Sequence, residues 1–161
     1  MKNHITFQID NFNIWIEEEN SKIKGVSFFA PIDLNLKETN ILLEAKNQIE
    51  DYFKGLRKEF DLPIEYRGTK FQKQVWELLL NLNYGEVLTY KQVAEIINKP
   101  KAYRAVGMAC NRNNIAIIIP CHRIVGVNGL VGYVGGLEIK EKLLGIEKAS
   151  VLNWCLFFID W

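Results

Sequence analysis

Ile119-Pro120-Cys121-His122-Arg123-Ile124 ends an unbroken apolar run that begins at Ile115, and this run predicts a short buried strand. Pro120 has no backbone N–H group and a fixed φ, so the strand has to end or bend there. A cysteine and a histidine follow directly, where the chain leaves the predicted core. Neighbouring cysteine and histidine side chains are able to form a nucleophile with its base. Most free cysteines are small buried hydrophobic residues, however, so the pair alone does not decide between a structural and a catalytic role.

The composition is that of a globular protein with one or two small domains. Of the 161 residues, 48% are hydrophobic and 24% are charged, and the formal net charge is +1. This balance lacks the strongly basic character of many nucleic-acid-binding proteins, although a local basic patch is able to supply the same field. We expect no membrane span, because no apolar run is long enough, and no signal peptide, because the first residues lack an apolar core.

The few cysteines and histidines limit the chemistry further. The three cysteines are Cys110, Cys121 and Cys155, and this odd number without a secretory signal predicts reduced thiols and a cytoplasmic protein. The only histidines are His4 and His122, and the N-terminal half has no cysteine. We therefore predict no zinc site of the Cys/His type and no other metal site.

Residues 1–66 predict a small α/β domain with a structural role. Segments rich in β-forming residues favour an antiparallel sheet, and they are residues 4–9, 12–18 and 22–29. Apolar residues then recur at helical spacing between residues 38 and 56, where Gly55 marks the end of the helix. A linker over residues 61–68 follows. No set of residues in this part has the composition of a catalytic site.

The part that begins at Arg67 predicts several helices. Thr69 and Gln72 form a capping box that opens one amphipathic helix, and Thr89 and Gln92 form a second. The predicted apolar face of the first of these helices consists of Phe71, Val75, Leu78, Leu79 and Leu82. A third helix is expected from Pro100 to about Asn111. A last helix is expected over residues 137–147, with Glu138, Lys140, Glu141 and Lys142 on its solvated face.

The second and third of these helices predict a helix-turn-helix. The third helix carries the basic residues Lys101 and Arg104 and several small ones, which allow a helix to approach another backbone closely. The small residues are Ala102, Ala105, Gly107 and Ala109. An ordinary packed helical hairpin has the same pattern, so the motif alone leaves DNA binding open.

Together these pieces resemble the O6-alkylguanine-DNA alkyltransferases, also called methylated-DNA–protein-cysteine methyltransferases. The similarity covers about residues 67–147, with every block in the order of the family. The matching blocks are Gly68-Thr69-x-Phe71-Gln72-x-x-Val75-Trp76, Tyr84-Gly85-x-x-x-Thr89-Tyr90, Arg104-Ala105-Val106-Gly107, Asn113, Ile119-Pro120-Cys121-His122-Arg123-Ile124-Val125, Gly132-Tyr133-x-Gly135-Gly136-Leu137 and Leu143-Leu144-x-x-Glu147. Any one block is weak, whereas the ordered set is highly specific.

The resemblance implies an α+β fold in which a small sheet-plus-helix domain, residues 1–66, precedes a helical, winged helix-turn-helix-like domain, residues 67–161. It also implies a DNA repair reaction. The family extrudes an alkylated guanine from duplex DNA and transfers the alkyl group to a cysteine of the protein. The thioether product is stable, so each molecule would react once. The resemblance implies no cofactor, and we expect a monomer that binds DNA in the minor groove.

The same resemblance assigns expected roles around the acceptor, which would be Cys121. His122 would accept the thiol proton through a water, and Glu147 would orient His122, which is a nucleophile–base–orienter arrangement. Asn113 would brace the turn that carries the cysteine. Tyr133 would hydrogen-bond guanine O6 and assist its departure.

The expected DNA contacts lie mostly on the helix-turn-helix. Arg104 would enter the base stack in place of the flipped nucleotide, and flipping costs a few kcal/mol. Tyr90 would line the base pocket near the phosphate, and Lys101 and Ala102 would lie at the groove. Ile124 and Val134 would read the edge of the base through their backbone groups.

Three other classes of protein share some of these features and have to be distinguished from a transferase. An alkyltransferase-like lesion binder has another residue, commonly tryptophan, in place of the cysteine, and Cys121 argues against it. A winged-helix regulator that senses through Cys121 is compatible with the helix-turn-helix, but no ligand-sensing domain is evident. A cysteine hydrolase would use the same Cys–His–Glu set but has no use for Arg104. The apolar tail, residues 151–161, is expected to pack over the fold or to form a dimer contact.

Overall fold

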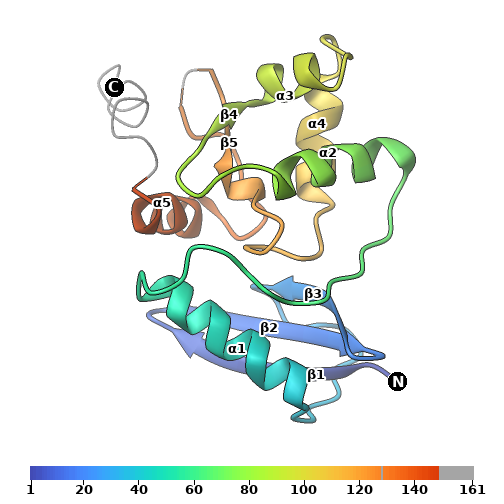
Figure 1. Ribbon diagram of the computed structural model, residues 1–161, viewed down its shortest axis with the longest axis vertical. Coiled ribbons are helices and arrows are strands. Elements are labelled where there is room, and N and C mark those ends of the chain that lie inside the picture. The colour runs from blue at the N-terminus through green and yellow to red at the C-terminus, as the bar shows by residue number, and fades with distance from the viewer. Residues whose placement is uncertain (128, 149–161) are drawn as a thin grey trace. The chain divides into compact units, whose positions relative to one another are not determined.

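The computed structural model describes residues 1–127 and 129–148, which form two compact units (Figure 1). The first unit contains residues 1–66 together with residues 114–118, and the second contains residues 67–113, 119–127 and 129–148. The sequence analysis did not anticipate that residues 114–118 group with the first unit. The helices and the small sheet give the mixed α and β composition that was predicted.

A three-stranded antiparallel sheet with one helix builds the first unit, as predicted. Its strands are β1 (Asn3–Ile9), β2 (Phe12–Glu19) and β3 (Lys22–Ser27), in the order β1-β2-β3, and its helix is α1 (Asn40–Phe53). Ile5 lies opposite Ile16 across β1 and β2, and both are buried. Helix α1 crosses the sheet in Figure 1 and contributes Leu42, Ala45 and Ile49 to the same core. Alternate strand residues therefore face α1, which is the pattern of a half-buried sheet.

Residues 115–119 are buried, but the prediction of a strand there was wrong. Ile115 forms only one parallel bridge, to Val26. Around it, Val26 N–H donates to the carbonyl of Asn114 (2.9 Å) and Ala116 N–H donates to the carbonyl of Val26 (3.0 Å). The chain then turns, with a φ of 72° at Ile117, a conformation that β-branched residues rarely adopt. The run is apolar because its side chains are buried in a turn, and a hydrophobic pattern alone does not distinguish this from a strand.

Three helices frame the second unit. They are α2 (Lys70–Leu80), α3 (Tyr90–Ile96) and α4 (Tyr103–Asn111). Both predicted capping boxes form. In the first, Thr69 Oγ1 accepts from Gln72 N–H (3.1 Å) and Thr69 N–H donates to Gln72 Oε1 (3.0 Å). Helices α2 and α3 each pack against α4.

The buried face of α2 differs from the predicted one. Its buried residues are Val75, Trp76 and Leu79, whereas Phe71 and Leu78 are only half-buried. Trp76 packs inward because its indole N–H donates to the carbonyl of Ala109, at 2.9 Å, and so finds a partner inside the core. This bond also joins α2 to the end of α4.

Helix α4 begins three residues later than predicted. Pro100 and Lys101 lie in a turn, and Ala102 is the N-cap residue, without a side-chain hydrogen bond to the helix. The turn is closed by Ala102 N–H, which donates to the carbonyl of Lys99 (2.9 Å). Lys101 and Ala102 therefore precede the helix that was expected to carry them, while Arg104 lies in its first turn.

Short elements complete the second unit. They are β4 (Leu88–Thr89), the 3₁₀ turn η1 (Cys121–Arg123), β5 (Ile124–Val125) and α5 (Leu137–Ile146). Strands β4 and β5 pair in parallel, with Leu88 opposite Ile124. Gly126 and Gly129 form the bridge of the turn that was predicted after the cysteine. Within the described residues, no helix combines the length and the apolar character that a membrane span needs.

Candidate active site

Cys121 opens the 3₁₀ turn η1 in the interior of the second unit. Its backbone N–H donates to the carbonyl of Ile119 (2.8 Å), and the N–H of Arg123 donates to that of Pro120 (3.0 Å). The side chain of Cys121 is 3% exposed and that of His122 is fully buried. A tight turn after Pro120 thus presents two adjacent reactive side chains inside the fold rather than at the surface.

Asn113 connects the end of α4 to this turn. Its side-chain amide donates to Cys121 Sγ (3.1 Å) and to the carbonyl of Ile119 (2.9 Å). The N–H of Asn113 donates to the carbonyl of Cys110, at 3.2 Å, in the last turn of α4. Asn113 is 4% exposed, so these contacts are shielded from water. The residue therefore braces the cysteine and donates to its sulfur, which favours a thiolate.

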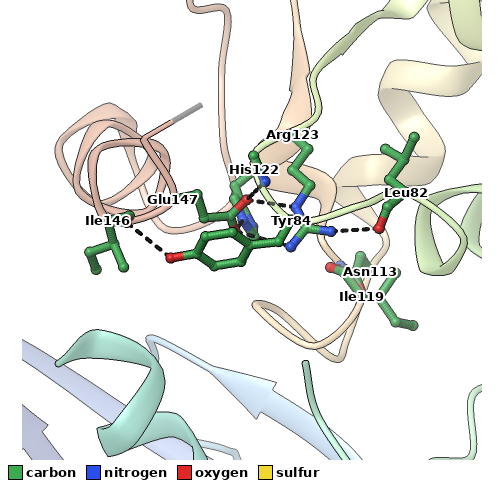
Figure 2. Close-up of polar contacts among 9 residues, drawn as sticks. Leu82, Tyr84, Asn113, Ile119, His122, Arg123, Ile146 and Glu147 are labelled. Atoms are coloured by element: carbon green, nitrogen blue, oxygen red, sulfur yellow. Dashed lines mark hydrogen bonds and ion pairs between the residues drawn. The ribbon is translucent and has the colours of Figure 1, made fainter. Parts of the chain in front are cut away.

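His122 and Glu147 form a buried pair, with 2.6 Å between Nε2 and Oε2 (Figure 2). Glu147 caps the C-terminus of α5. Burial by itself would raise the pKa of Glu147, but the hydrogen bond from His122 and the hydrogen bonds and charge of Arg123 outweigh it and hold that pKa well below its usual range. Burial lowers the pKa of His122, against the opposite pull of Glu147. A neutral imidazole therefore donates its Nε2–H to a carboxylate, which leaves Nδ1 as the basic nitrogen.

Arg123 also binds Glu147, a contact that the sequence analysis did not predict. Its Nε donates to Oε1 (2.8 Å), its Nη2 donates to Oε2 (3.2 Å), and its Nη1 donates to the carbonyl of Leu82 (3.0 Å). Figure 2 shows the guanidinium between the carboxylate and Leu82. Arg123 belongs to the matched block, but the motif gave no reason to expect a buried ion pair.

Lys140 is fully buried, so its predicted place on the solvated face of α5 was wrong. Its Nζ donates to the carbonyls of Ile124 (2.6 Å), Gly132 (3.0 Å) and Val131 (3.1 Å). Burial lowers its pKa to about 8, although the thiols of Cys121 and Cys110 pull the other way. Helical spacing contains the signal that was missed, because Lys140 shares one face of α5 with the buried residues Leu143, Leu144 and Glu147.

The surroundings of Cys121 act on its thiol in opposite directions. Burial is the largest effect and raises its pKa, while the Asn113 amide, the Lys140 charge and the Tyr133 hydroxyl lower it. The hydroxyl of Tyr133 is buried, and burial together with the nearby Cys121 sulfur raises the pKa of Tyr133 well above its usual value. Tyr133 thus stays protonated near the sulfur. The five residues expected to act in catalysis, Cys121, His122, Glu147, Asn113 and Tyr133, all lie in this cluster.

The residues expected to contact DNA or the base are more dispersed. Tyr90 donates from its hydroxyl to the carbonyl of Val131 (3.1 Å), and its ring centroid is 5.9 Å from Lys140 Nζ. Burial and the nearby thiols raise the pKa of Tyr90. Arg104, Lys101 and Val134 are exposed, and Ala102 is half-buried. Ile124 is buried, and its carbonyl already accepts from Lys140.

The described residues offer no metal site. No group of three or more His, Cys, Asp or Glu side chains in residues 1–127 and 129–148 is placed to hold an ion. Cys110 and Cys121 are buried free thiols. Cys155 and the tail over residues 151–161 lie outside the described residues.

Comparisons with known proteins give the family. Residues 70–149 match the model of the 6-O-methylguanine DNA methyltransferase, DNA binding domain. A methylated-DNA–protein-cysteine methyltransferase of Methanosarcina barkeri is 57% identical over 109 residues, which are 67% of this chain and 69% of that protein. The inducible enzyme of that name from Bacillus subtilis is 49% identical over 142 residues, 85% of this chain and 79% of that protein.

Solved structures agree. The O6-methylguanine methyltransferase of Mycobacterium tuberculosis superposes with a TM-score of 0.85 at 33% identity, over 96% of this chain and 99% of that one. Mycobacterium tuberculosis OGT in complex with DNA superposes with a TM-score of 0.81 at 36% identity, over 92% of both chains.

The fold, the buried Cys–His–Glu cluster and these matches define a transferase with a cysteine nucleophile. Relatives well above 30% identity cover most of the chain and share one name. The chain belongs to the family of methylated-DNA–protein-cysteine methyltransferases. This confirms the resemblance drawn from the sequence and decides for the transferase among the classes that the sequence left open.

Proposed function

We propose that Cys121 is the acceptor in the reaction of this family, the transfer of an alkyl group from O6-alkylguanine in duplex DNA to a cysteine of the protein. The reaction repairs the DNA and consumes the protein, because a thioether is not cleaved by ordinary thiols. One observation carries the assignment to Cys121: its sulfur lies in the same buried turn as His122, whose Nε2 is 2.6 Å from the ionised Glu147. Cys110, the other buried thiol of the described residues, is followed by no histidine.

The chemistry balances with the residues of the cluster. The thiol of Cys121 gives its proton to His122 Nδ1, through a water as in the family, and the thiolate attacks the alkyl carbon. An S–C bond forms while the C–O6 bond breaks, and the electron pair of that bond goes to the guanine. Tyr133 donates a proton to O6, and the proton held by His122 restores the tyrosine. Asn113 and Lys140 stabilise the thiolate before the attack.

We further propose that α3 and α4 act as a helix-turn-helix in the minor groove, with β4 and β5 completing a winged arrangement. Arg104 and Lys101 are exposed and free to approach phosphates and bases, and the half-buried Ala102 offers a small surface between them. Arg104 enters the stack as the guanine leaves it, and Tyr90 lines the base pocket. The backbones of Ile124 and Val134 read the edge of the base.

The remaining expectations complete the proposal. The protein acts as a monomer in the cytoplasm, where Cys110 and Cys121 stay reduced. Residues 1–66 have a structural role, because their buried polar side chains already pair with one another. His4, for example, contacts Glu17 Oε2 through Nε2 (3.0 Å) and accepts from Asn35 N–H through Nδ1 (3.0 Å).

Intact-mass measurement tests the assignment. The protein is incubated with duplex DNA that carries a single O6-methylguanine, and we expect the mass of one methyl group to be added and to map to Cys121. Cys121→Ser should gain no methyl group, whereas the matched variant Cys110→Ser should gain it as the wild type does. A methyl group on another residue, or tight binding to the lesion with no mass change, would refute the proposal.

A further inference from the structure

The carboxylate of Glu147 is held from several sides. Besides the His122 ring, it accepts from both Nε and Nη2 of Arg123 and from the backbone N–H of Gly85 (3.1 Å). Both oxygens are engaged, and the side chain is fully buried. A carboxylate in such a place stays charged only because its donors compensate for lost hydration.

Arg123 connects this carboxylate to the turn that follows the C-terminus of α2. While two of its nitrogens bind Glu147, Nη1 donates to the carbonyl of Leu82. A bidentate contact between a guanidinium and a carboxylate fixes the orientation of both planes, which a single ammonium does not do. The side chain therefore sets the direction in which Glu147 Oε2 faces His122.

The turn formed by residues 82–85 fixes the helix end that carries Glu147. Tyr84 donates from its hydroxyl to the carbonyl of Ile146 (3.0 Å), as Figure 2 shows. Gly85 has a φ of 80°, and a Cβ there would lie 3.2 Å from the carbonyl oxygen of Glu147. Only a residue without a side chain fits easily in that conformation and space. The end of α5, the turn and Arg123 thus form one connected support.

We propose that Arg123 is a positioning residue for alkyl transfer, which holds the Glu147 carboxylate where it orients His122 and so acts on Cys121 through two other side chains. The inference rests on the proposed role of Cys121. Arg123 itself touches neither the sulfur nor the substrate in this role. Tyr84 and Gly85 support it by fixing the end of α5.

The tautomer of His122 explains how Arg123 reaches the chemistry. An ionised Glu147 accepts from Nε2–H and leaves Nδ1 as the base. Loss of Arg123 removes hydrogen bonds and a charge that lower the pKa of Glu147, so burial is less well compensated and a protonated Glu147 becomes more populated. A protonated carboxyl donates to Nε2, the proton of the imidazole moves to Nδ1, and the nitrogen that should accept the thiol proton becomes a donor. The other titratable groups that act on this pair are Tyr84, Tyr133 and Lys140.

A merely structural ion pair would give a different result from a positioning residue. If Arg123 only stabilises the fold, the effects of Arg123→Met and Glu147→Gln on the reaction rate should be independent of each other. If it acts through Glu147, Arg123→Met should slow the reaction of the otherwise wild-type protein. The same change should not slow the reaction of Glu147→Gln any further. Because the double variant replaces both partners, it leaves neither charge buried without its partner, and we expect it to stay folded.

The experiment measures two rates for the full chain across pH. One is single-turnover methyl transfer from an O6-methylguanine duplex, and the other is alkylation of Cys121 by iodoacetamide, mapped by peptide mass. For Arg123→Met we expect both rates at neutral pH to fall roughly tenfold or more, within the ~10²–10⁴-fold contribution of a positioned general base. The midpoint of the iodoacetamide profile should move to higher pH. Arg123→Lys should recover part of the rate.

Matched controls separate the possible failures. Arg67→Met, the same change at an exposed arginine of the same unit, should leave both profiles unchanged. Tyr84→Phe, a milder change, should lower both rates in the same direction as Arg123→Met. Unchanged profiles in folded Arg123→Met, or losses that add in the double variant, would overturn the inference while methyl transfer to Cys121 stands. If the wild type is methylated elsewhere, it is the role of Cys121 that fails, and the iodoacetamide profiles still decide whether Arg123 acts on that thiol.

Discussion

The side-chain amide of Asn113 lies 3.1 Å from the sulfur of Cys121, and both residues are buried. Asn113 lies two residues after the end of α4, and its backbone N–H donates to the carbonyl of Cys110. The end of the proposed DNA-recognition helix and the proposed acceptor thiol are therefore joined through one side chain.

Asn113→Ala should raise the pKa of the Cys121 thiol and slow its reaction, because the sulfur loses a donor that favours the thiolate. The carbonyl of Ile119 loses the same donor, so unfolding should cost about 1–3 kcal/mol less. The pH profile of iodoacetamide labelling at Cys121 and urea unfolding measure the two effects. Asn114→Ala, at the exposed neighbour, is the control, and an unchanged labelling profile in Asn113→Ala would show that the bond does not tune the thiol.

Lys140→Met should destabilise the second unit by about 1–3 kcal/mol, because the carbonyl of Ile124 loses a buried donor and those of Val131 and Gly132 lose a partly buried one. These carbonyls belong to the strand after Cys121 and to the loop before Tyr133, so the reaction should slow as well. Urea unfolding and single-turnover methyl transfer measure both effects. Lys142→Met changes an exposed residue two positions further along α5, and its free energy of unfolding should stay within about 0.5 kcal/mol of the wild type. Equal stability of the two variants would contradict the structural role of Lys140.

Lys140 also shows where the sequence was insufficient. Charged residues are usually exposed, so the charge of Lys140 led to a prediction of exposure, although its helical spacing places it on the buried face of α5. The capping boxes at Thr69 and Thr89 were predictable because a cap depends on a few neighbouring residues. The turn at residues 115–118 and the Arg123–Glu147 pair were not, because they depend on contacts between distant parts of the chain. The cluster around Cys121 could be located only through the ordered motifs, since no local pattern brings Glu147 to His122.

Acid should destabilise the protein in a window set by His122 and Glu147. Both have a pKa below the ordinary value when folded, so the unfolded chain binds more protons as the pH falls. Stability contributed by His122 should be present above about pH 6.5 and decline below it, and that of Glu147 should decline below about pH 4.5. Urea unfolding between pH 7 and pH 3 measures the slope, which reaches about 1.4 kcal/mol per pH unit for each additional proton that the unfolded chain binds.

Glu147→Gln isolates the second part of this slope. The variant should be less stable at neutral pH but should lose less stability below pH 4.5 than the wild type. Glu141→Gln, an exposed residue of the same helix, should keep the slope of the wild type. Parallel curves for the wild type and Glu147→Gln would mean that Glu147 has an ordinary pKa in the folded protein.

Arg104→Ala should separate base flipping from chemistry. Arg104 is exposed in the first turn of α4, and none of the described contacts joins it to Cys121. If it fills the space of the flipped nucleotide, its loss should slow repair of O6-methylguanine in duplex DNA far more than reaction with a free O6-substituted guanine, which needs no flipping. Because flipping costs a few kcal/mol, we expect a loss of roughly tenfold to a hundredfold on the duplex and little on the free base. Single-turnover rates with both substrates measure this, and Arg67→Ala, also exposed, should leave the ratio of the two rates unchanged. Equal losses on both substrates would assign Arg104 to the support of the site rather than to flipping.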